Sequence, residues 1–235
     1  MPGKFIFLFV FLFAAICSLF AQGSEAANHE LVIRGEVYID LEPMYIGHID
    51  EEYPLNAQTA GQRALDELSL FFSAMVYGWA FNYEIGERAR GITENFELEQ
   101  LGVIQRSDPA MRVTDTSVSN SQLRVWADYQ LNDAQRRRMN VWRTNIVRNA
   151  QAVGYGPSAI DEYPGWFALK KMALEDAAKN ALRVMLQGSE RNRPKEVNGF
   201  ISLASFPRYY IESGRWAVSA RFRVQVTDII PFAAY

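Results

Sequence analysis

The chain has 235 residues, with 24 Lys and Arg against 27 Asp and Glu, a formal net charge of −3, one cysteine and two histidines. This weak acidity argues against nucleic-acid binding, which requires a basic surface to neutralise phosphates. A single cysteine excludes an intrachain disulfide framework, so an ordinary hydrophobic core must stabilise the fold. The length suffices for one large domain or for two domains of about 100 residues each.

Residues 1–21 have the layout of a secretory signal peptide. Lys4 supplies a positive start, residues 5–20 are almost wholly apolar, and small residues follow. The apolar run is shorter than the roughly 20 residues that span a bilayer, which argues against a membrane anchor. A lipid anchor at Cys17 is the other alternative, but Ile16 disfavours it because the residue before a lipidated cysteine is normally small. We therefore expect export to the periplasm or to the periplasmic face of the outer membrane.

Residues 29–132 predict a first unit that consists of a strand, a helix and a hairpin. Apolar residues between positions 31 and 39 indicate the strand. Residues 57–77 carry apolar side chains at intervals of three and four, which is typical of a helix with one buried face, and Gly78 marks its end. Residues 111–116 and 123–131 flank a polar Ser-Asn-Ser turn and predict the hairpin.

A cluster of aromatic side chains interrupts this first unit. Trp79, Phe81 and Tyr83 follow the helix directly, and Arg88 and Arg90 come soon after them. Aromatic residues and arginine are enriched at the centres of protein interfaces, so these five residues are candidates for a partner interface. The alternative is an additional strand, or an extension of the helix, that packs on the core.

A basic segment, residues 133–149, joins the first unit to the rest of the chain. It contains Arg136, Arg137 and Arg138 in sequence, with Trp142 shortly after them. One interpretation is a linker helix with a solvated arginine face and Trp142 packed on the protein. The other is a surface for an anionic partner, and the three arginines are therefore further interface candidates.

Residues 150–228 repeat the order of the first unit, and residues 229–235 follow as a C-terminal tail. The predicted elements are a strand at 150–153, a turn at Gly154 and Gly156, a helix at 165–186, and a hairpin of strands 200–210 and 216–226 that turns at 212–215. The sequence therefore predicts an α+β fold of two tandem strand-helix-hairpin units. In each unit a helix packs on a small antiparallel sheet.

The second unit also carries a motif known from a protein superfamily. The glycine-bearing segment Ala152-Val153-Gly154-Tyr155-Gly156 precedes the helical segment Ala173-Leu174-Glu175-Asp176-Ala177-Ala178-Lys179-Asn180-Ala181-Leu182. This pattern resembles the superfamily that includes Lpp20-type outer-membrane lipoproteins and the amino-terminal domain of flagellar assembly protein T. The resemblance covers residues 150–228 well and residues 31–131 only in outline. It implies a structural or assembly role at the periplasmic face of the envelope, often around the flagellum, and no catalytic residues.

Residues 154–159 have the form G-x-G-x-x-A, which also occurs in dinucleotide-binding proteins. Phosphate binding there requires free backbone N–H groups at the start of a helix, and Pro157 has none. We interpret Gly154 and Gly156 as a turn that uses glycine dihedral angles, and we expect no cofactor.

The titratable residues do not predict a catalytic or metal site. His29 and His48 lack metal-type partners at ligand spacing. Adjacent carboxylates such as Asp66 and Glu67 point about 100° apart on a helix, so they do not converge on one substrate atom. We expect both side chains of this pair, and the equivalent pair in the second helix, to lie on the solvent side.

These observations lead to two hypotheses of different classes. The first is a non-enzymatic envelope protein with a structural or assembly role, acting on envelope or flagellar proteins or on a second copy of itself. The second is a periplasmic module that binds a small ligand or carbohydrate, with Trp79, Tyr83 or Trp166 as stacking platforms in a concave pocket. Neither involves nucleic acid, and membrane contact is expected only through the signal peptide or a lipid on Cys17.

Overall fold

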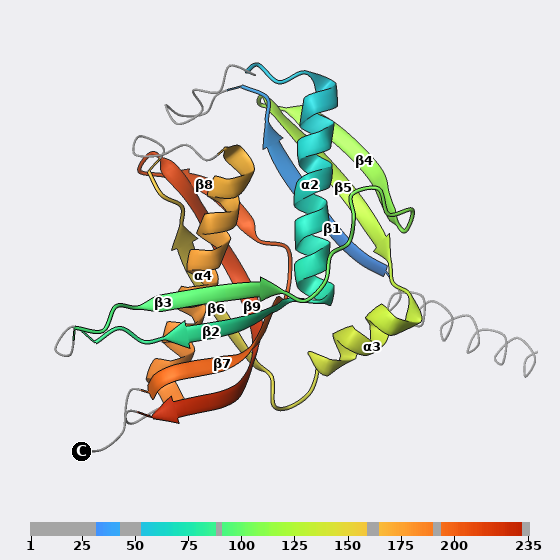
Figure 1. Ribbon diagram of the computed structural model, residues 1–235. Helices are drawn as coiled ribbons and strands as arrows, with labels where there is room; N and C mark the ends of the chain where they lie inside the picture. Colours follow the sequence, from blue (N-terminus) through green and yellow to red (C-terminus); the bar gives the residue numbers. More distant parts are fainter. Residues whose placement is uncertain (1–31, 43–52, 88–90, 159–164, 190–193, 232–235) are drawn as a thin grey trace, which may run out of the picture.

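The computed structural model describes residues 32–42, 53–87, 91–158, 165–189 and 194–231. The expected signal peptide with Cys17, both histidines, Arg88 and Arg90 lie outside these ranges. The fold is α+β, with helices packed on two antiparallel sheets (Figure 1). No helix in the described ranges is both long and apolar enough to cross a bilayer.

The elements follow one another in an order that contains the expected pattern twice. They are β1 (Val32–Asp40), α2 (Ala57–Val76), β2 (Trp79–Glu84), β3 (Asn95–Gln100), β4 (Met111–Ser119), β5 (Gln122–Gln130), α3 (Asp133–Val141), β6 (Arg148–Tyr155), α4 (Trp166–Ser189), β7 (Pro194–Leu203), β8 (Arg208–Glu212) and β9 (Arg215–Pro231). We call β1, α2, β4 and β5 the first repeat, and β6, α4 and β7 to β9 the second repeat.

The first repeat has the predicted strand, helix and hairpin. Its sheet has the order β1-β5-β4, and α2 packs against β1 and β5. Helix α2 begins after Asn56, whose side chain accepts a 2.8 Å hydrogen bond from the backbone N–H of Thr59. It ends before Gly78, which adopts φ +70° and so permits the chain to leave the helix. The turn between β4 and β5 uses Asn120 and Ser121, both with positive φ, as a two-residue hairpin requires.

The second repeat lies in a larger sheet of order β3-β2-β7-β9-β6, in which β8 also pairs with β9. Helix α4 packs against β6 and β9. The expected turn that uses the dihedral angles of Gly154 and Gly156 is wrong, because Gly154 lies inside β6 and neither glycine has a positive φ. A Cβ atom at Gly154 would stand 2.0 Å from the backbone nitrogen of Ala177, so the glycine allows close approach of strand and helix.

The expected strand at residues 200–210 is two strands. Strand β7 ends at Leu203 and β8 begins at Arg208, and both pair with the 17-residue strand β9. Pro207 in the break lacks a backbone N–H and cannot continue the ladder. The break gives Phe206 a position outside the regular pleat.

The basic linker forms a shorter helix than expected. Helix α3 begins with a capping box between Asn132 and Gln135 and ends at Val141. Trp142 follows it and is buried, and its indole N–H donates to the carbonyl of Val76 at 3.4 Å. The linker is therefore attached to the end of α2, as the interpretation with a packed tryptophan predicts.

Each repeat packs against a segment that lies, in sequence, within the other repeat. Strand β2, which lies in sequence inside the first repeat, pairs with β7 of the second (Figure 1). In return, Phe206 of the second repeat packs edge-on against Phe71 and Phe72 of α2. Its ring occupies the place that a side chain at Gly35 of β1 would fill. The two repeats therefore share a continuous core.

Candidate functional site

The aromatic residues that the sequence offered as interface candidates belong to this core. Trp79, Phe81 and Tyr83 are only 5%, 3% and 2% exposed. They alternate on one face of β2, which is the second strand of the larger sheet. The structure thus has the additional strand that packs on the core, and these three rings form no exposed partner surface.

A polar network attaches β2 and the residue before β3 to α4. The Tyr83 hydroxyl donates to Glu94 at 2.6 Å, and the guanidinium of Arg183 donates to both residues. Burial and the hydrogen bond to Glu94 raise the pKa of Tyr83 to about 12. Burial acts to raise the pKa of Glu94, but hydrogen bonds from Tyr83 and Arg183 outweigh it and lower this pKa below its usual value. The role of this network is therefore to hold Tyr83 and Glu94 against Arg183 of α4.

The three consecutive arginines of α3 point to different places. Arg136 pairs with Asp133 one turn earlier in the helix. Arg138 turns toward α2, where its guanidinium donates to the Tyr77 carbonyl at 3.4 Å. A cation at the C-terminal end of a helix is favourable because the carbonyl dipoles there carry partial negative charge. Arg136 and Arg137 instead line a surface cavity, so the structure separates Arg138 from the other two.

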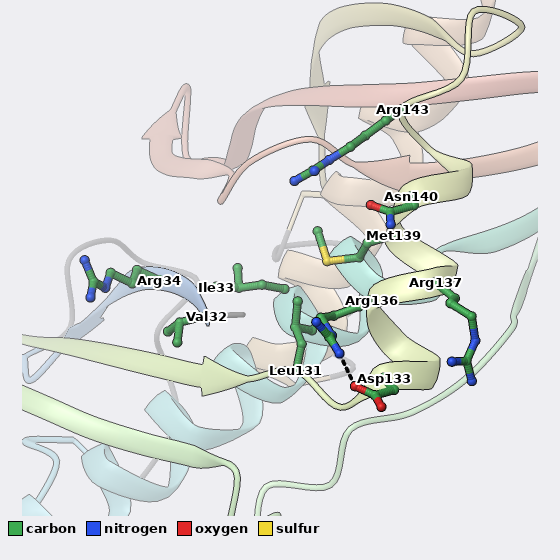
Figure 2. A pocket seen from close by; sticks show the side chains of 10 residues that line it. All are labelled: Val32, Ile33, Arg34, Leu131, Asp133, Arg136, Arg137, Met139, Asn140 and Arg143. Carbon is green, nitrogen blue, oxygen red and sulfur yellow. Dashed lines mark hydrogen bonds and ion pairs between the residues drawn. The ribbon is translucent and has the colours of Figure 1, made fainter. Parts of the chain in front are cut away.

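This cavity, which we call the basic pocket, lies between α3 and the start of β1 and has a volume of about 490 Å³ (Figure 2). Its lining consists of Val32, Ile33, Arg34, Leu131, Asp133, Arg136, Arg137, Met139, Asn140 and Arg143. Figure 2 shows Ile33, Leu131 and Met139 at the centre with Arg136 beside Leu131, and Arg34, Arg137 and Arg143 farther out. The pocket therefore has an apolar floor and a basic rim.

The charge of the rim favours an anionic group. The lining has four arginines and one carboxylate, Asp133, and that carboxylate is already paired with Arg136. Arg34 reaches Asp128 at 3.4 Å, but its side chain remains 64% exposed. The lining offers no histidine, cysteine or unpaired carboxylate, so it is suited to binding rather than to acid–base or nucleophilic chemistry.

A second cavity, which the sequence did not predict, lies between the two repeats. This inter-repeat cleft has a volume of about 800 Å³. It is lined by Glu36, Val37, Tyr38, Asp40, Glu67, Phe71, Gln122, Lys170, Phe206, Pro207, Arg208, Tyr209, Tyr210, Ile211 and Trp216. The residues come from β1, α2, β5, α4, β8, β9 and the segment before β8. Only the packing of the two repeats brings them together.

An ion pair between Glu67 of α2 and Lys170 of α4 lies at the bottom of this cleft. Their side chains are 3% and 6% exposed. Lys170 also lies over the rings of Trp216 and Tyr209, at 4.6 and 5.3 Å from their centroids. Burial raises the pKa of Glu67, and the nearby positive charge of Lys170 opposes this rise. Burial also raises the pKa of Tyr209 well above its usual value.

The solvent-side interpretation of Glu67 was therefore wrong. Its neighbour Asp66 is the exposed member of the pair and contacts Arg106 at 3.3 Å. One sequence signal for the burial exists: Glu67 stands next to Leu68 and three residues after Ala64, which are both buried. That spacing places it at the border of the apolar face, where a carboxylate needs a buried partner.

The second carboxylate pair of the sequence has a structural role. Asp176 accepts hydrogen bonds from the backbone N–H of Tyr155 at 3.0 Å and from the Asn180 amide at 3.1 Å. Asn180 also donates to the carbonyl of Val153 at 3.0 Å. The acidic and asparagine positions of the helical motif thus attach α4 to β6. Among the described residues, no group of three or more His, Cys, Asp or Glu side chains is arranged to hold a metal ion.

Comparisons with known proteins give a family and one relative. A protein of Treponema pallidum (strain Nichols), which carries the name "Uncharacterized protein", is 26% identical over 220 residues, covering 86% of this chain and 90% of the relative. No solved structure matches the chain. A protein-family model matches residues 19–232, which span both repeats and the linker, and the chain therefore belongs to the family that this model defines.

Proposed function

We propose that this protein is a non-enzymatic, exported envelope protein with a structural or assembly role, and that it binds an acidic segment of a partner protein at the basic pocket. The observation that carries this proposal is the lining of that pocket, in which four arginines and one paired aspartate surround an apolar floor. Arginine is favoured at protein interfaces because its planar guanidinium binds carboxylates in a bidentate way while its stem covers apolar surface.

Three further observations support a role in protein contacts. The exposed apolar side chains of Val141 and Ile146 lie next to the pocket in sequence. The layout of residues 1–21 supports export. The resemblance of residues 150–228 to a superfamily of envelope and flagellar assembly proteins supports an envelope partner, with flagellar proteins among the candidates.

Site-specific cross-linking in the native cells tests the contact. A photoreactive amino acid at Asn140, inside the pocket, should form adducts with a partner protein, whereas the same group at Val184, 59% exposed on α4, should not. The double substitution Arg137→Glu with Arg143→Glu should reduce the adducts by at least about tenfold, because it reverses two charges at the rim.

The matched control makes the same charge change elsewhere. Arg112→Glu with Lys195→Glu alters two exposed residues of β4 and β7 that do not line the pocket. It should leave the adducts unchanged. Equal adducts in both double variants, or no adducts from Asn140, would contradict the proposal.

Export has its own test. The intact mass of the protein isolated from its native cells should correspond to a chain that begins after residue 21 or residue 23. A mass that includes the N-terminal methionine and residues 2–20 would contradict export through a cleaved signal peptide.

A further inference from the structure

We propose that the inter-repeat cleft is a binding site for an uncharged, polyhydroxylated ligand, such as a short oligosaccharide. The cleft measures about 800 Å³. This lies inside the range of about 300 to 1,000 Å³ that is usual for small-molecule sites. The proposal concerns a second site on the molecule and does not depend on the basic pocket.

Aromatic rings form much of the cleft wall. Tyr38 of β1 and Tyr210 of β8 are 43% and 40% exposed, so a ligand can reach them from solvent. Deeper in the wall, Tyr209 stacks on Phe71 with centroids 5.9 Å apart and meets Trp216 edge-on at 6.2 Å. The C–H faces of sugar rings pack well on aromatic rings, which offer apolar area with little loss of side-chain entropy.

Asp40 and Gln122 supply hydrogen-bond acceptors at one side of the cleft. Asp40 is 9% exposed, and one of its carboxylate oxygens accepts a 2.7 Å hydrogen bond from the Gln122 amide. The other carboxylate oxygen and the amide oxygen of Gln122 form no hydrogen bond with the described residues. Two acceptors fixed side by side match neighbouring hydroxyl groups of a sugar.

The balance of charge favours an uncharged ligand. Of the three carboxylates in the lining, Glu36 is paired with Arg124 and Glu67 with Lys170. Asp40 and Arg208 form no ion pair with described residues. The carboxylate of Asp40 therefore offers acceptors and the guanidinium of Arg208 offers donors to an uncharged ligand. A strongly charged ligand would instead meet one group that carries a charge of its own sign.

The cleft is also held in a fixed shape. The Glu67–Lys170 pair joins α2 to α4 below it, and the Tyr209 hydroxyl donates to the Lys170 carbonyl at 3.0 Å. Phe206, which lines the cleft, packs against Gly35 of β1. A cavity whose walls are fixed before binding loses less entropy when a ligand enters.

Ligand-observed NMR on the full mature chain tests the proposal, with cellobiose, chitobiose and maltotriose as probes. At least one probe should show saturation transfer from the protein and a Kd of about 10 mM or less. Asp40→Asn and Tyr210→Ala should each weaken that binding by at least about fivefold, since each removes a charged acceptor or a stacking ring. Thermal unfolding of each variant shows that the protein remains folded.

Asp66→Asn and Tyr77→Ala are the matched controls, because they change the same residue types outside the cleft. They should leave binding unchanged. The proposal is overturned if none of the three probes binds at about 20 mM. It is also overturned if the two cleft variants bind as the wild type does.

Discussion

The buried ion pair between Glu67 and Lys170 is one of the contacts that join the two repeats. Each charge has lost almost all its hydration, since the side chains are 3% and 6% exposed. Such a pair gains little net stability over apolar side chains of the same size, but removing one partner leaves an uncompensated buried charge. We therefore expect the pair to act mainly by specifying how α2 meets α4.

Lys170→Met should lower the free energy of unfolding by about 3 to 5 kcal/mol at neutral pH. The loss should shrink as the pH falls, because a protonated Glu67 requires no counter-charge. The double variant Glu67→Leu with Lys170→Met should regain most of the loss, since it leaves no unpaired charge. Urea unfolding of the two single variants and the double variant gives the coupling energy. A cost below about 1 kcal/mol for both single variants would show that the pair is not buried as described.

The carboxylate of Glu94, which accepts a hydrogen bond from Tyr83 of β2, predicts how the stability of the protein depends on pH. Its pKa in the folded protein is lower than its usual value. The contribution of its carboxylate to stability is therefore complete above the unfolded pKa of about 4.3 and is lost as the pH falls through the folded pKa. Glu94→Gln should reduce stability by about 1 to 2 kcal/mol at pH 7. Chemical unfolding between pH 7 and pH 3 should show this difference shrink once the pH falls below the unfolded pKa, and a difference independent of pH would contradict the assignment.

At the scale of the elements, close packing between helices and strands depends on particular glycines. Gly154 of β6 lies against the backbone of α4, so no side chain fits there. Gly61 lies within α2 and has open space where a Cβ atom would stand. The same residue type thus serves packing at one position and only weakens helix formation at the other.

These two glycines give a matched pair of substitutions. Gly154→Ala should destabilise the protein by at least about 2 kcal/mol, because helix α4 must move away from the strand. Gly61→Ala should stabilise it by about 0.5 to 1 kcal/mol, because alanine favours the helix and meets no neighbour. Thermal melting of both variants distinguishes the effects. Equal shifts in the same direction would contradict the contact between β6 and α4.

At the scale of the whole molecule, the exchange of β2 and Phe206 makes each repeat incomplete without the other. Strand β2 lies between β3 and β7 in the larger sheet. Phe206 fills space between β1 and α2 in the first repeat. The two repeats should therefore unfold together, unlike two domains joined by a linker.

Calorimetry of the protein should show one unfolding transition whose calorimetric and van't Hoff enthalpies agree. Phe206→Ala should lower stability by about 3 to 5 kcal/mol through loss of packing in the first repeat. The variant should keep a single transition, because β2, which directly follows α2 in the chain, still pairs with β7 in the larger sheet. Two separated transitions in the wild-type protein would contradict the interlocked architecture.

The amino-acid sequence by itself determined the local elements of this protein. Apolar spacing at three and four residues defines α2 and α4, and the polar turns at residues 120–121 and 213–214 define two hairpins, since these signals act between neighbours in the chain. The α+β class follows from the order of such elements.

Only the tertiary structure decided where Trp79, Glu67 and Phe206 lie. The aromatic residues of β2 alternate as in a strand, but their partner strand β7 is more than 100 residues away in sequence, and no local pattern specifies that pairing. The inter-repeat cleft likewise arises from side chains of both repeats, and the basic pocket from α3 and the start of β1. Burial and contact between distant segments depend on how the whole chain packs, because the free energy of each contact is realised only when both partners are in place.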